Sequence, residues 1–307
     1  MRVDVHSHAG RCFLAGLPED HGMVARFGRE AIAESLAVAA DAGMTAIWLA
    51  TVADLAVLAL DPVKGLYAHR DFEPGEVWAD HQRQLDSLRE ATRDAGLQVL
   101  ISCEGADFLE GDLSRLEEVV ALGVSSLTLV HYRVNELGDV QTEQPAHGGL
   151  TAFGKDVVAE CNRLGVVVDC AHASTDTTMD VLTASRHPVM ISHSHLHGPG
   201  PSHPRLLSEP HARAVADAGG LIGAWPSGVV CRNLDDFGDE ILRLVDLVGV
   251  DHVGIGTDMD GNYRPVLTEY RQFDELAEYL AAQGLSAADI EKVFGRNAFA
   301  LLVAVQG

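Results

Sequence analysis

Eight short β-branched segments, each followed by a stretch with helical periodicity, constrain the fold of this chain more than any other feature of its sequence. Such segments predict strands. They cover Arg2–His8, Thr45–Thr51, Gln98–Glu104, Ser125–His131, Val166–His172, Val189–His193, Gly220–Trp225 and His252–Asp258. Continuous apolar strands separated by helices are typical of a parallel sheet that is covered on both faces.

The stretches between these strands predict helices with the usual start and stop signals. The predicted helices are Glu30–Ala42, Asp80–Asp94, Leu113–Leu122, Gly154–Leu164, Asp176–Ser185, Glu209–Ala218 and Asp236–Val248, and Glu269–Gln283 and Ala287–Val303 would complete an outer ring. Several end in a glycine just before the next strand, as a helix C-terminus commonly does. The alternation predicts an α/β fold, a (β/α)8 TIM barrel, formed by residues 1–307 as one domain. The alternative is an open doubly wound sheet, but the glycine-rich dinucleotide fingerprint is missing after the first strand.

Chemically distinctive side chains stand where the predicted strands end. Six of the eight strands stop at a histidine or a carboxylate, and these residues are His6 and His8, Glu104, His131, His172, His193 and Asp258. In (β/α)8 barrels, active sites lie at the C-terminal ends of the strands. The sequence therefore predicts a metal site at that end of the barrel.

The first strand and the third strand carry the first part of this site. His6 and His8 are two residues apart, so their imidazoles point to the same face of the strand and can converge on one metal ion. Glu104 closes a buried strand, where a carboxylate needs a partner to offset its desolvation. A carbamylated lysine is another common bridge between two metals, but Lys64, Lys155 and Lys292 are the only lysines and none ends a predicted strand. Glu104 is therefore the predicted bridge.

Two further histidines end adjacent strands and suit a second zinc ion. His172 and His193 each follow an apolar run, and imidazole nitrogen is a preferred zinc ligand. The chain around them is rich in histidine, and we predict that the additional ones lie in loops. These are His195, His197, His203 and His211, of which His195 is expected to come nearest to the site.

Asp258 ends the eighth predicted strand. A carboxylate at this place, next to a metal-activated water, can act as a general base and then protonate the leaving group. Asp260 lies two residues further on, before Gly261, and we interpret it as a turn residue. The segment from Asp54 to Asp80 is the longest predicted loop, and its place between the second strand and its helix predicts that it shapes a substrate site.

Charge and cysteine content exclude several other classes of protein. The 22 basic and 45 acidic residues give a formal charge of −23, which disfavours binding to nucleic acid or to an anionic membrane surface. The five cysteines are odd in number and lack Cys-x-x-Cys spacing, so they predict reduced thiols. With no basic and apolar leader before the first strand, we expect a cytoplasmic protein.

At the level of motifs, the chain resembles the membrane (renal) dipeptidase family of zinc metallopeptidases, within the amidohydrolase superfamily. The resemblance rests on the run from His147 to Gly154, on Asp169 to Ser174 and on Pro188 to Ser194, and is reinforced by Glu104-Gly105, by Leu127 to His131, by Asp258 to Gly261 and by Gly295-Arg296-Asn297. These motifs stand in the family order and cover nearly the whole chain.

The resemblance implies a two-zinc site that is bridged by Glu104. It implies that His131 polarises the scissile carbonyl or steadies the tetrahedral intermediate, that Arg205 pairs with the free carboxylate of the substrate, and that Asp258 carries the proton. The family usually has His-x-Asp in the first strand, whereas this chain has His6-Ser7-His8. That exchange removes one negative charge from the ligands of the first metal.

The expected function is that of a metallo-dipeptidase, which hydrolyses short peptides by means of a hydroxide that bridges the two zinc ions. The alternative is an amidohydrolase acting on N-acyl amino acids, lactams or lactones, because fold and metals fix the type of reaction and loops fix the substrate. A third hypothesis is a non-catalytic metal-binding scaffold. The expected partner is a small peptide substrate, and the resemblance leaves a homodimer open.

Overall fold

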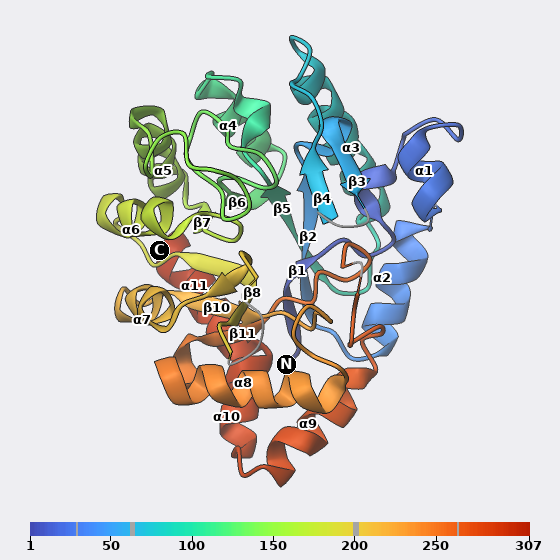
Figure 1. The fold of residues 1–307 in the computed structure, drawn as a ribbon. Coiled ribbons are helices and arrows are strands. Elements are labelled where there is room, and N and C mark those ends of the chain that lie inside the picture. Colours follow the sequence, from blue (N-terminus) through green and yellow to red (C-terminus); the bar gives the residue numbers. More distant parts are fainter. Residues whose placement is uncertain (29, 62–64, 199–202, 263) are drawn as a thin grey trace.

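Eight parallel strands form the framework of the molecule, as the sequence predicts (Figure 1). The structure is a computed structural model, and it describes residues 1–307 except 29, 62–64, 199–202 and 263. The strands are β1 (Val3–Ser7), β2 (Ala46–Val52), β5 (Gln98–Glu104), β6 (Val124–Thr128), β7 (Val167–Asp169), β8 (Met190–Leu196), β10 (Leu221–Ala224) and β11 (Val253–Ile255). They pair in parallel in this same order, which is that of a (β/α)8 barrel.

The barrel closes just beyond the last strand rather than within it. The His8 amide donates to the Met259 carbonyl at 2.8 Å, and the Asp258 amide donates to the His6 carbonyl at 2.9 Å. Below these bonds, the buried Asp4 carboxylate accepts from the Thr257 amide at 2.9 Å. The seam between β1 and β11 is therefore closed next to the residues that were predicted to bind metal.

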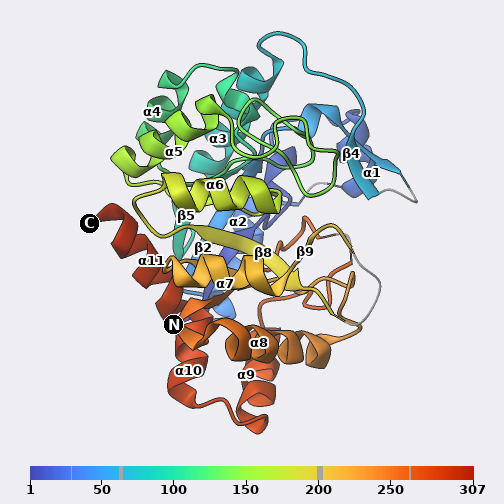
Figure 2. The same cartoon turned by 60° about the vertical axis from the view of Figure 1, so that its left-hand side comes forward.

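The helices follow the predicted order and surround the strands (Figure 2). They are α2 (Ile32–Asp41), α3 (Glu76–Ala91), α4 (Ser114–Ala121), α5 (Ala152–Leu164), α6 (Thr175–Ala184), α7 (Glu209–Asp217), α8 (Leu234–Val248), α9 (Gln272–Ala282), α10 (Ala287–Glu291) and α11 (Asn297–Gln306). Side-chain oxygens cap the N-termini of α5, α6, α7, α8 and α10, which satisfies amide groups that a helix leaves unpaired.

The last predicted helix, Ala287–Val303, is interrupted. A π-helical segment, Lys292–Arg296, separates α10 from α11, and Gly295 departs from helical dihedral angles within it. A Cβ atom on Gly295 would lie 2.8 Å from Val3 Cγ2, so the chain passes too close to β1 for any larger residue. The helix therefore bends where it meets the bottom of the barrel.

The predicted loop Asp54–Asp80 contains regular structure, which corrects that interpretation. It holds the 3-10 turn η2 (Leu55–Val57), the antiparallel hairpin of β3 (Leu58–Asp61) and β4 (Gly65–Ala68), and the first turn of α3. The 3-10 turn η1 (Cys12–Leu14) and the short helix α1 (Gly22–Phe27) were not predicted either. These elements lie together at one side of the barrel mouth (Figure 1).

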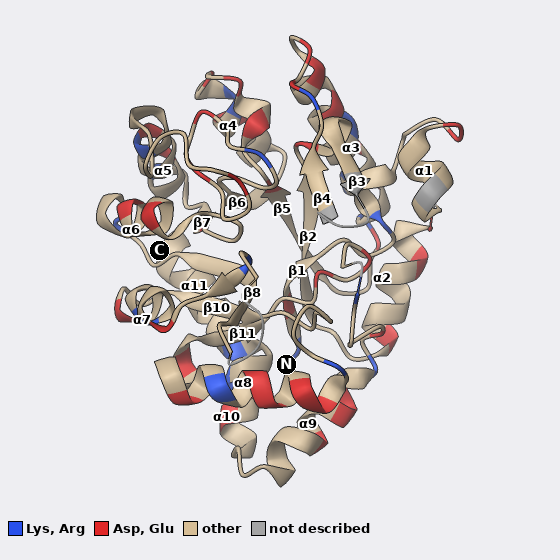
Figure 3. Ribbon diagram, viewed as in Figure 1, with Lys and Arg blue, Asp and Glu red and all other residues tan. Residues whose placement is uncertain are grey.

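The interior of the barrel changes character along its axis. Its lower part is apolar and is filled by residues such as Trp48, Val167 and Leu221, against which α11 packs Leu301 and Leu302. The upper part is buried but polar, and it holds the predicted site. Acidic residues are spread over the outer helices (Figure 3). Among the described residues, no helix is both long and apolar enough to cross a membrane.

Candidate active site

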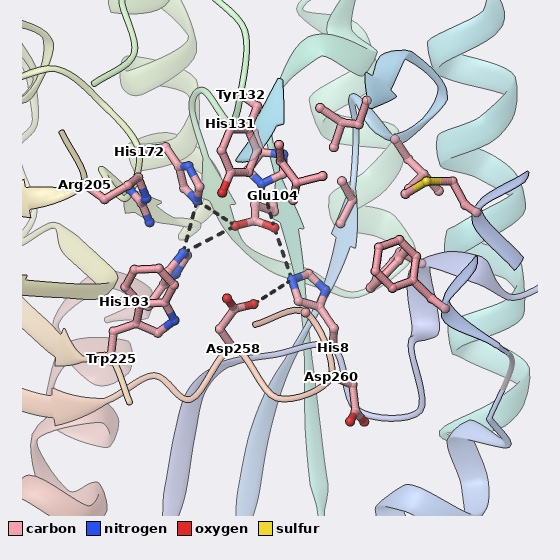
Figure 4. Close-up of a pocket in the computed structure, with 18 residues that line it drawn as sticks. His8, Glu104, His131, Tyr132, His172, His193, Arg205, Trp225, Asp258 and Asp260 are labelled. Atoms are coloured by element: carbon pink, nitrogen blue, oxygen red, sulfur yellow. Dashed lines mark hydrogen bonds and ion pairs between the residues drawn. The ribbon is translucent and has the colours of Figure 1, made fainter. Parts of the chain in front are cut away.

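Glu104, the last residue of β5, lies at the centre of a cluster of histidines in the barrel mouth (Figure 4). On one side of its carboxylate, His6 Nε2 and His172 Nε2 lie 3.3 and 3.1 Å from Oε1. His193 Nε2 lies 3.7 Å from the same oxygen and 3.1 Å from His172 Nε2. Three predicted metal ligands, His6, His172 and His193, thus face the same carboxylate oxygen of a fourth, Glu104.

The other carboxylate oxygen, Oε2, faces a different pair of imidazoles. His8 Nε2 is 3.2 Å from it and His131 Nε2 is 3.4 Å from it. Burial opposes the charge of Glu104, but the surrounding imidazoles outweigh burial and hold the pKa of this carboxyl well below its usual 4.5. Glu104 is therefore an anion, and each of its two oxygens faces at least two imidazoles.

Hydrogen bonds behind the cluster indicate which nitrogen of His193 and of His8 faces inward. Ser192 Oγ donates its proton to Asp169 Oδ2 at 2.7 Å, so the Ser192 oxygen can itself accept from His193 Nδ1–H at 3.0 Å. His8 Nδ1–H donates to the Ala50 carbonyl at 3.0 Å. With the proton on Nδ1, the Nε2 lone pair points into the site, and this is the arrangement found around metal-bound histidines.

The donor set fits a metal site. Two ligands of a tetrahedral zinc with bonds of about 2.1 Å lie about 3.4 Å apart, which matches the separations of 3.1 to 3.7 Å around Glu104. His6 Nε2 is buried and has no hydrogen-bond partner among the described residues. Burial lowers the pKa of both His172 and His193 well below 6.5, which keeps them in the neutral form that binds metal.

Two overlapping groups have the geometry of a metal-binding triad. One is His6, His8 and Glu104, as predicted for the first metal, and the other is Glu104, His131 and His172. The second contains His131 where the sequence predicts His193, although His193 lies within 3.7 Å of Glu104 as well. All five predicted ligands are therefore in one cluster, and His131 is close enough to join them.

His131 is held by a carboxylate that the sequence analysis missed. Its Nδ1–H donates to Asp54 Oδ1 at 2.6 Å, and the Tyr132 amide donates to Asp54 Oδ2 at 3.0 Å. Burial disfavours the cationic imidazole, but the charges of Asp54 and Glu104 outweigh it and raise the pKa of His131 above 6.5. The one signal in the sequence was that Asp54 breaks the apolar run from Ala46 to Leu60.

Asp258 lies opposite Glu104 and faces the same space (Figure 4). Its Oδ1 is 3.5 Å from His8 Nε2, and burial raises its pKa to about 6. A carboxyl group with this pKa can both accept and release a proton near neutral pH. Gly261 permits the arrangement, because a Cβ atom there would lie 2.4 Å from His8 Cδ2 and 2.5 Å from Asp258 Oδ1.

Asp260 is in the turn that the sequence predicts, but it also lines the pocket. The Gly261 amide closes the turn on the Asp258 carbonyl at 3.0 Å. The Asp260 carboxylate accepts from the Gly10 amide at 2.8 Å, and in Figure 4 it points away from Glu104.

Arg205 enters the pocket from the turn before β9 (Leu206–Leu207). Its side chain is buried, with the guanidinium 5.5 Å from the centre of the Trp225 ring and Nη1 donating to Gln141 Oε1 at 2.8 Å. Nε and Nη2 are buried without a hydrogen-bond partner among the described residues. A buried cation with two unused donors is costly unless an anion completes it, and so the site is suited to an anionic group at this end.

Strained backbone gathers at the same place. Five described residues other than glycine have a left-handed φ, and His172 (65°), Asp258 (54°) and Asp260 (64°) are three of them. All three line the pocket. This conformation is unfavourable for residues with a side chain and is enriched at functional sites.

Three of the predicted strand ends are wrong by three residues. His131, His172 and Asp258 were predicted to end strands, but β6, β7 and β11 end three residues earlier, at Thr128, Asp169 and Ile255. The left-handed φ of His172 and Asp258 is incompatible with extended backbone, so neither residue is part of a strand. They project from short loops into the barrel mouth.

The prediction that the extra histidines lie in loops is wrong for two of them. His195 is inside β8, which continues to Leu196 because it pairs there with β9, and His211 is in α7. His195 is not among the residues that line the pocket. Burial lowers its pKa to about 3, so it remains neutral beside Trp225.

The fold of the whole chain is similar to that of solved metallopeptidases. A dipeptidase AC, described as a metallopeptidase of family M19, matches with a TM-score of 0.82 at 21% identity, over 100% of this chain and 98% of that one. A metallopeptidase from Rhodobacter sphaeroides, solved with a phosphinate mimic of the dipeptide L-Ala-D-Ala, matches with a TM-score of 0.78 at 19% identity, over 99% of both chains. At these identities the likeness supports the barrel fold.

Sequence relatives carry the comparison further. Dipeptidase aclJ of Aspergillus oryzae is 33% identical over 213 residues, which are 66% of this chain and 50% of that protein. Dipeptidase tcpJ of Claviceps purpurea is 29% identical over 246 residues, 75% of this chain and 57% of that protein. The chain thus spans about half the length of these curated relatives. The family model of the membrane dipeptidases, peptidase family M19, matches residues 79–307.

Proposed function

The chain belongs to the membrane dipeptidase family, peptidase family M19, and on that premise we propose that it is a zinc-dependent dipeptidase. Its substrates would be short peptides, dipeptides above all, with a free carboxylate. The proposed metal ligands are His6, His8, Glu104, His172 and His193, with Glu104 as the bridge between two zinc ions.

Three further residues would carry out the reaction with the metals. Bound zinc would supply Lewis acidity, which lowers the pKa of a water molecule towards about 7 and polarises the scissile carbonyl. Asp258 would accept the proton of the attacking water and pass it to the departing amine. His131, held cationic by Asp54, would donate from Nε2 to the carbonyl oxygen as negative charge develops there. Arg205 would bind the substrate carboxylate through Nε and Nη2.

The observation that carries this proposal is the buried guanidinium of Arg205 beside the ligand cluster. Two of its donors have no partner among the described residues, and both it and Glu104 line the same pocket. A peptide that places its scissile carbonyl at Glu104 and its carboxylate at Arg205 must be short. N-acyl amino acids also carry a free carboxylate on the residue whose amide bond would be cleaved. They are therefore the alternative substrates.

The first experiment is to measure metal content together with hydrolysis of L,L and L,D dipeptides and of N-acyl amino acids. We expect about two zinc ions per chain, and dipeptide cleavage that a chelator abolishes and added zinc restores. Two metals with cleavage of N-acyl amino acids alone would move the substrate to the alternative class. Two metals and no hydrolysis of any short amide would favour the non-catalytic scaffold, and one metal or none would contradict the two-zinc site.

The compartment and the assembly are part of the same proposal. All five cysteines are buried and unpaired, which suits a reducing compartment such as the cytoplasm. Sedimentation velocity of the purified chain would show whether it forms a homodimer.

A further inference from the structure

The side of the pocket that faces away from Arg205 is almost entirely apolar. Phe13 of η1 and Met23 and Phe27 of α1 form one part of it, and Leu55, Leu58 and Leu66 of η2 and the β3–β4 hairpin form the other. We call these six side chains the apolar wall. The carboxylates among the described lining residues are Glu104, Asp258 and Asp260, and none of them belongs to the wall.

The apolar wall is not an extension of the barrel core. Phe13, Leu55 and Leu58 belong to a hydrophobic cluster that is separate from the two clusters of the barrel, and Met23 and Phe27 pack against it. Tyr132, next to His131, packs against the same cluster. The pocket between this cluster and the histidines holds about 670 Å³ of empty space, part of it open to solvent.

The wall and Arg205 lie on opposite sides of Glu104. The Phe13 ring is 5.2 Å from the His8 ring, and His8 is on the Oε2 side of the carboxylate. Arg205 stacks on Trp225, whose ring is 5.7 Å from that of His193, on the Oε1 side. Figure 4 agrees, with Arg205 and Trp225 on one side of Glu104 and the unlabelled apolar side chains beyond His8 on the other.

This arrangement fixes the direction of a bound dipeptide, if the proposed function holds. With the carboxylate at Arg205 and the scissile carbonyl at Glu104, the carboxy-terminal residue of the dipeptide lies between these two side chains, which line the same pocket. The residue that supplies the carbonyl then continues away from Arg205. Its side chain points into the part of the pocket that is bounded by the apolar wall.

We propose that the apolar wall is the binding site for the side chain of the substrate's amino-terminal residue, and that the enzyme selects dipeptides in which this residue is leucine, methionine or phenylalanine. Burial of the four carbon atoms of a leucine side chain, which glycine lacks, favours binding by a factor of about 100. Leucine in place of glycine at this position should therefore raise kcat/KM by about 100-fold, and charged residues should be rejected.

The test compares two dipeptide series on the zinc-loaded enzyme. One varies the amino-terminal residue before alanine, with Gly, Ala, Leu, Met, Phe, Lys and Glu, and the other varies the second residue after alanine. We expect kcat/KM in the first series to rise about 100-fold from Gly-Ala to Leu-Ala, and the second series to vary much less. Similar rates throughout the first series, with dipeptides cleaved, would overturn this inference and leave the proposed function intact. No cleavage of any dipeptide would overturn both.

Variants of the wall make the test specific to these residues. Leu66→Glu and Met23→Glu each place a carboxylate on a partly exposed position of a different element, so folding should be retained in both. We expect each to lower kcat/KM for Leu-Ala by about 10-fold or more and to raise the ratio of Lys-Ala to Leu-Ala. Val303→Glu, an apolar to acidic change at an exposed position of α11, is the matched control. An unchanged ratio in both wall variants would contradict the proposal.

Discussion

The two halves of the pocket are built in different ways. The polar half consists mainly of side chains at or just beyond the ends of barrel strands, with Glu104 at the end of β5 and His172 beyond the end of β7 as examples. The apolar half consists of segments inserted between a strand and its helix, namely η1 and α1 after β1, and η2 with the β3–β4 hairpin after β2. One half is fixed by the sheet, and the other is fixed by its own small hydrophobic cluster.

This difference separates chemistry from selectivity. Ligand positions that are pinned by strand pairing cannot shift without disturbing the barrel, whereas inserted segments can change in sequence and length while the barrel stays intact. Substitutions of the proposed metal ligands and of Asp258 should therefore lower the rate for every substrate. Substitutions in the apolar half should change the order of preference among substrates.

The largest effect should come from Asp258→Asn. An amide cannot take the proton of the attacking water, so we expect kcat to fall by about 10³-fold for all dipeptides, within the range for loss of a general base. Zinc content should stay unchanged. Near-normal turnover with full metal content would show that another group carries the proton.

Asp260→Asn is the contrasting variant for this prediction. Its carboxylate accepts a backbone hydrogen bond from Gly10 and points away from Glu104. We expect a loss of less than 10-fold. A larger loss than that of Asp258→Asn would mean that the two carboxylates have been assigned in the wrong order.

The polar half was predictable from the sequence because strand ends in a parallel barrel meet at one rim. His6, Glu104, His172 and His193 each follow or close an apolar run, and the alternation of strands and helices alone indicates that such ends converge. No local feature of the sequence predicted the left-handed backbone of His172, which places the ring beyond the strand rather than at its last residue.

The apolar half and the partner of His131 were not predictable by the same reasoning. α1, β3 and β4 have six, four and four residues, too few to show a helical or alternating period against the background of a long connection. Asp54 acts on His131 across 77 positions of the chain, and a contact of that kind has no local signature. Both features become visible only when the strands are in place.

Arg205→Ala should have the second largest effect and should be specific to one end of the substrate. Hydrogen bonds to a charged group contribute about 1.5–3 kcal/mol, so losing the guanidinium should lower kcat/KM by about 100-fold, mainly through KM. Dipeptide amides, which lack the carboxylate, should be poor substrates for the native enzyme and should lose little further in the variant. Arg213→Ala, at an exposed position of α7, is the control.

Asp54→Asn should have a smaller effect on the polar half, through His131. Asp54 raises the pKa of His131, and the cationic form is present below that pKa. Without the carboxylate the pKa falls, so activity that needs the cation should be lost at a lower pH on the alkaline side of the profile. We expect kcat to fall by about 10-fold, with KM and zinc content little changed.

The matched control for Asp54→Asn is Asp71→Asn, because the Asp71 side chain is 95% exposed. An Asp54→Asn profile with the same alkaline limb as the native enzyme would exclude the charge of Asp54 as the cause. Loss of zinc from this variant would instead place His131 among the metal ligands, together with Glu104 and His172.

Substitution of His81 should have the smallest effect on the pocket, because His81 belongs to neither the polar nor the apolar half. His81 lies on α3 behind β5, and its ring stacks on that of Phe108 with 4.0 Å between the ring centres. Its Nε2 accepts a hydrogen bond from the thiol of Cys103 at 3.3 Å. Cys103 directly precedes Glu104 in the chain. Burial lowers its pKa to about 3. The unfolded chain binds a proton there near pH 6.5, so the contribution of His81 to stability is complete above pH 6.5 and declines as the pH falls towards 3.

His81→Phe keeps a ring on Phe108 and removes the titrating group. Between pH 7 and pH 5 the native protein should lose about 2 kcal/mol more of its free energy of unfolding than the variant does, as measured by urea denaturation at both pH values. His197→Phe, at an exposed position, should lose as much as the native protein. Equal losses of unfolding free energy in the native protein and in His81→Phe would mean that His81 is protonated in the folded protein. Water would then reach the space between α3 and β5, behind Glu104. Because His81 contacts neither half of the pocket, the ranking of dipeptide substrates at pH 7 should be the same in all three proteins.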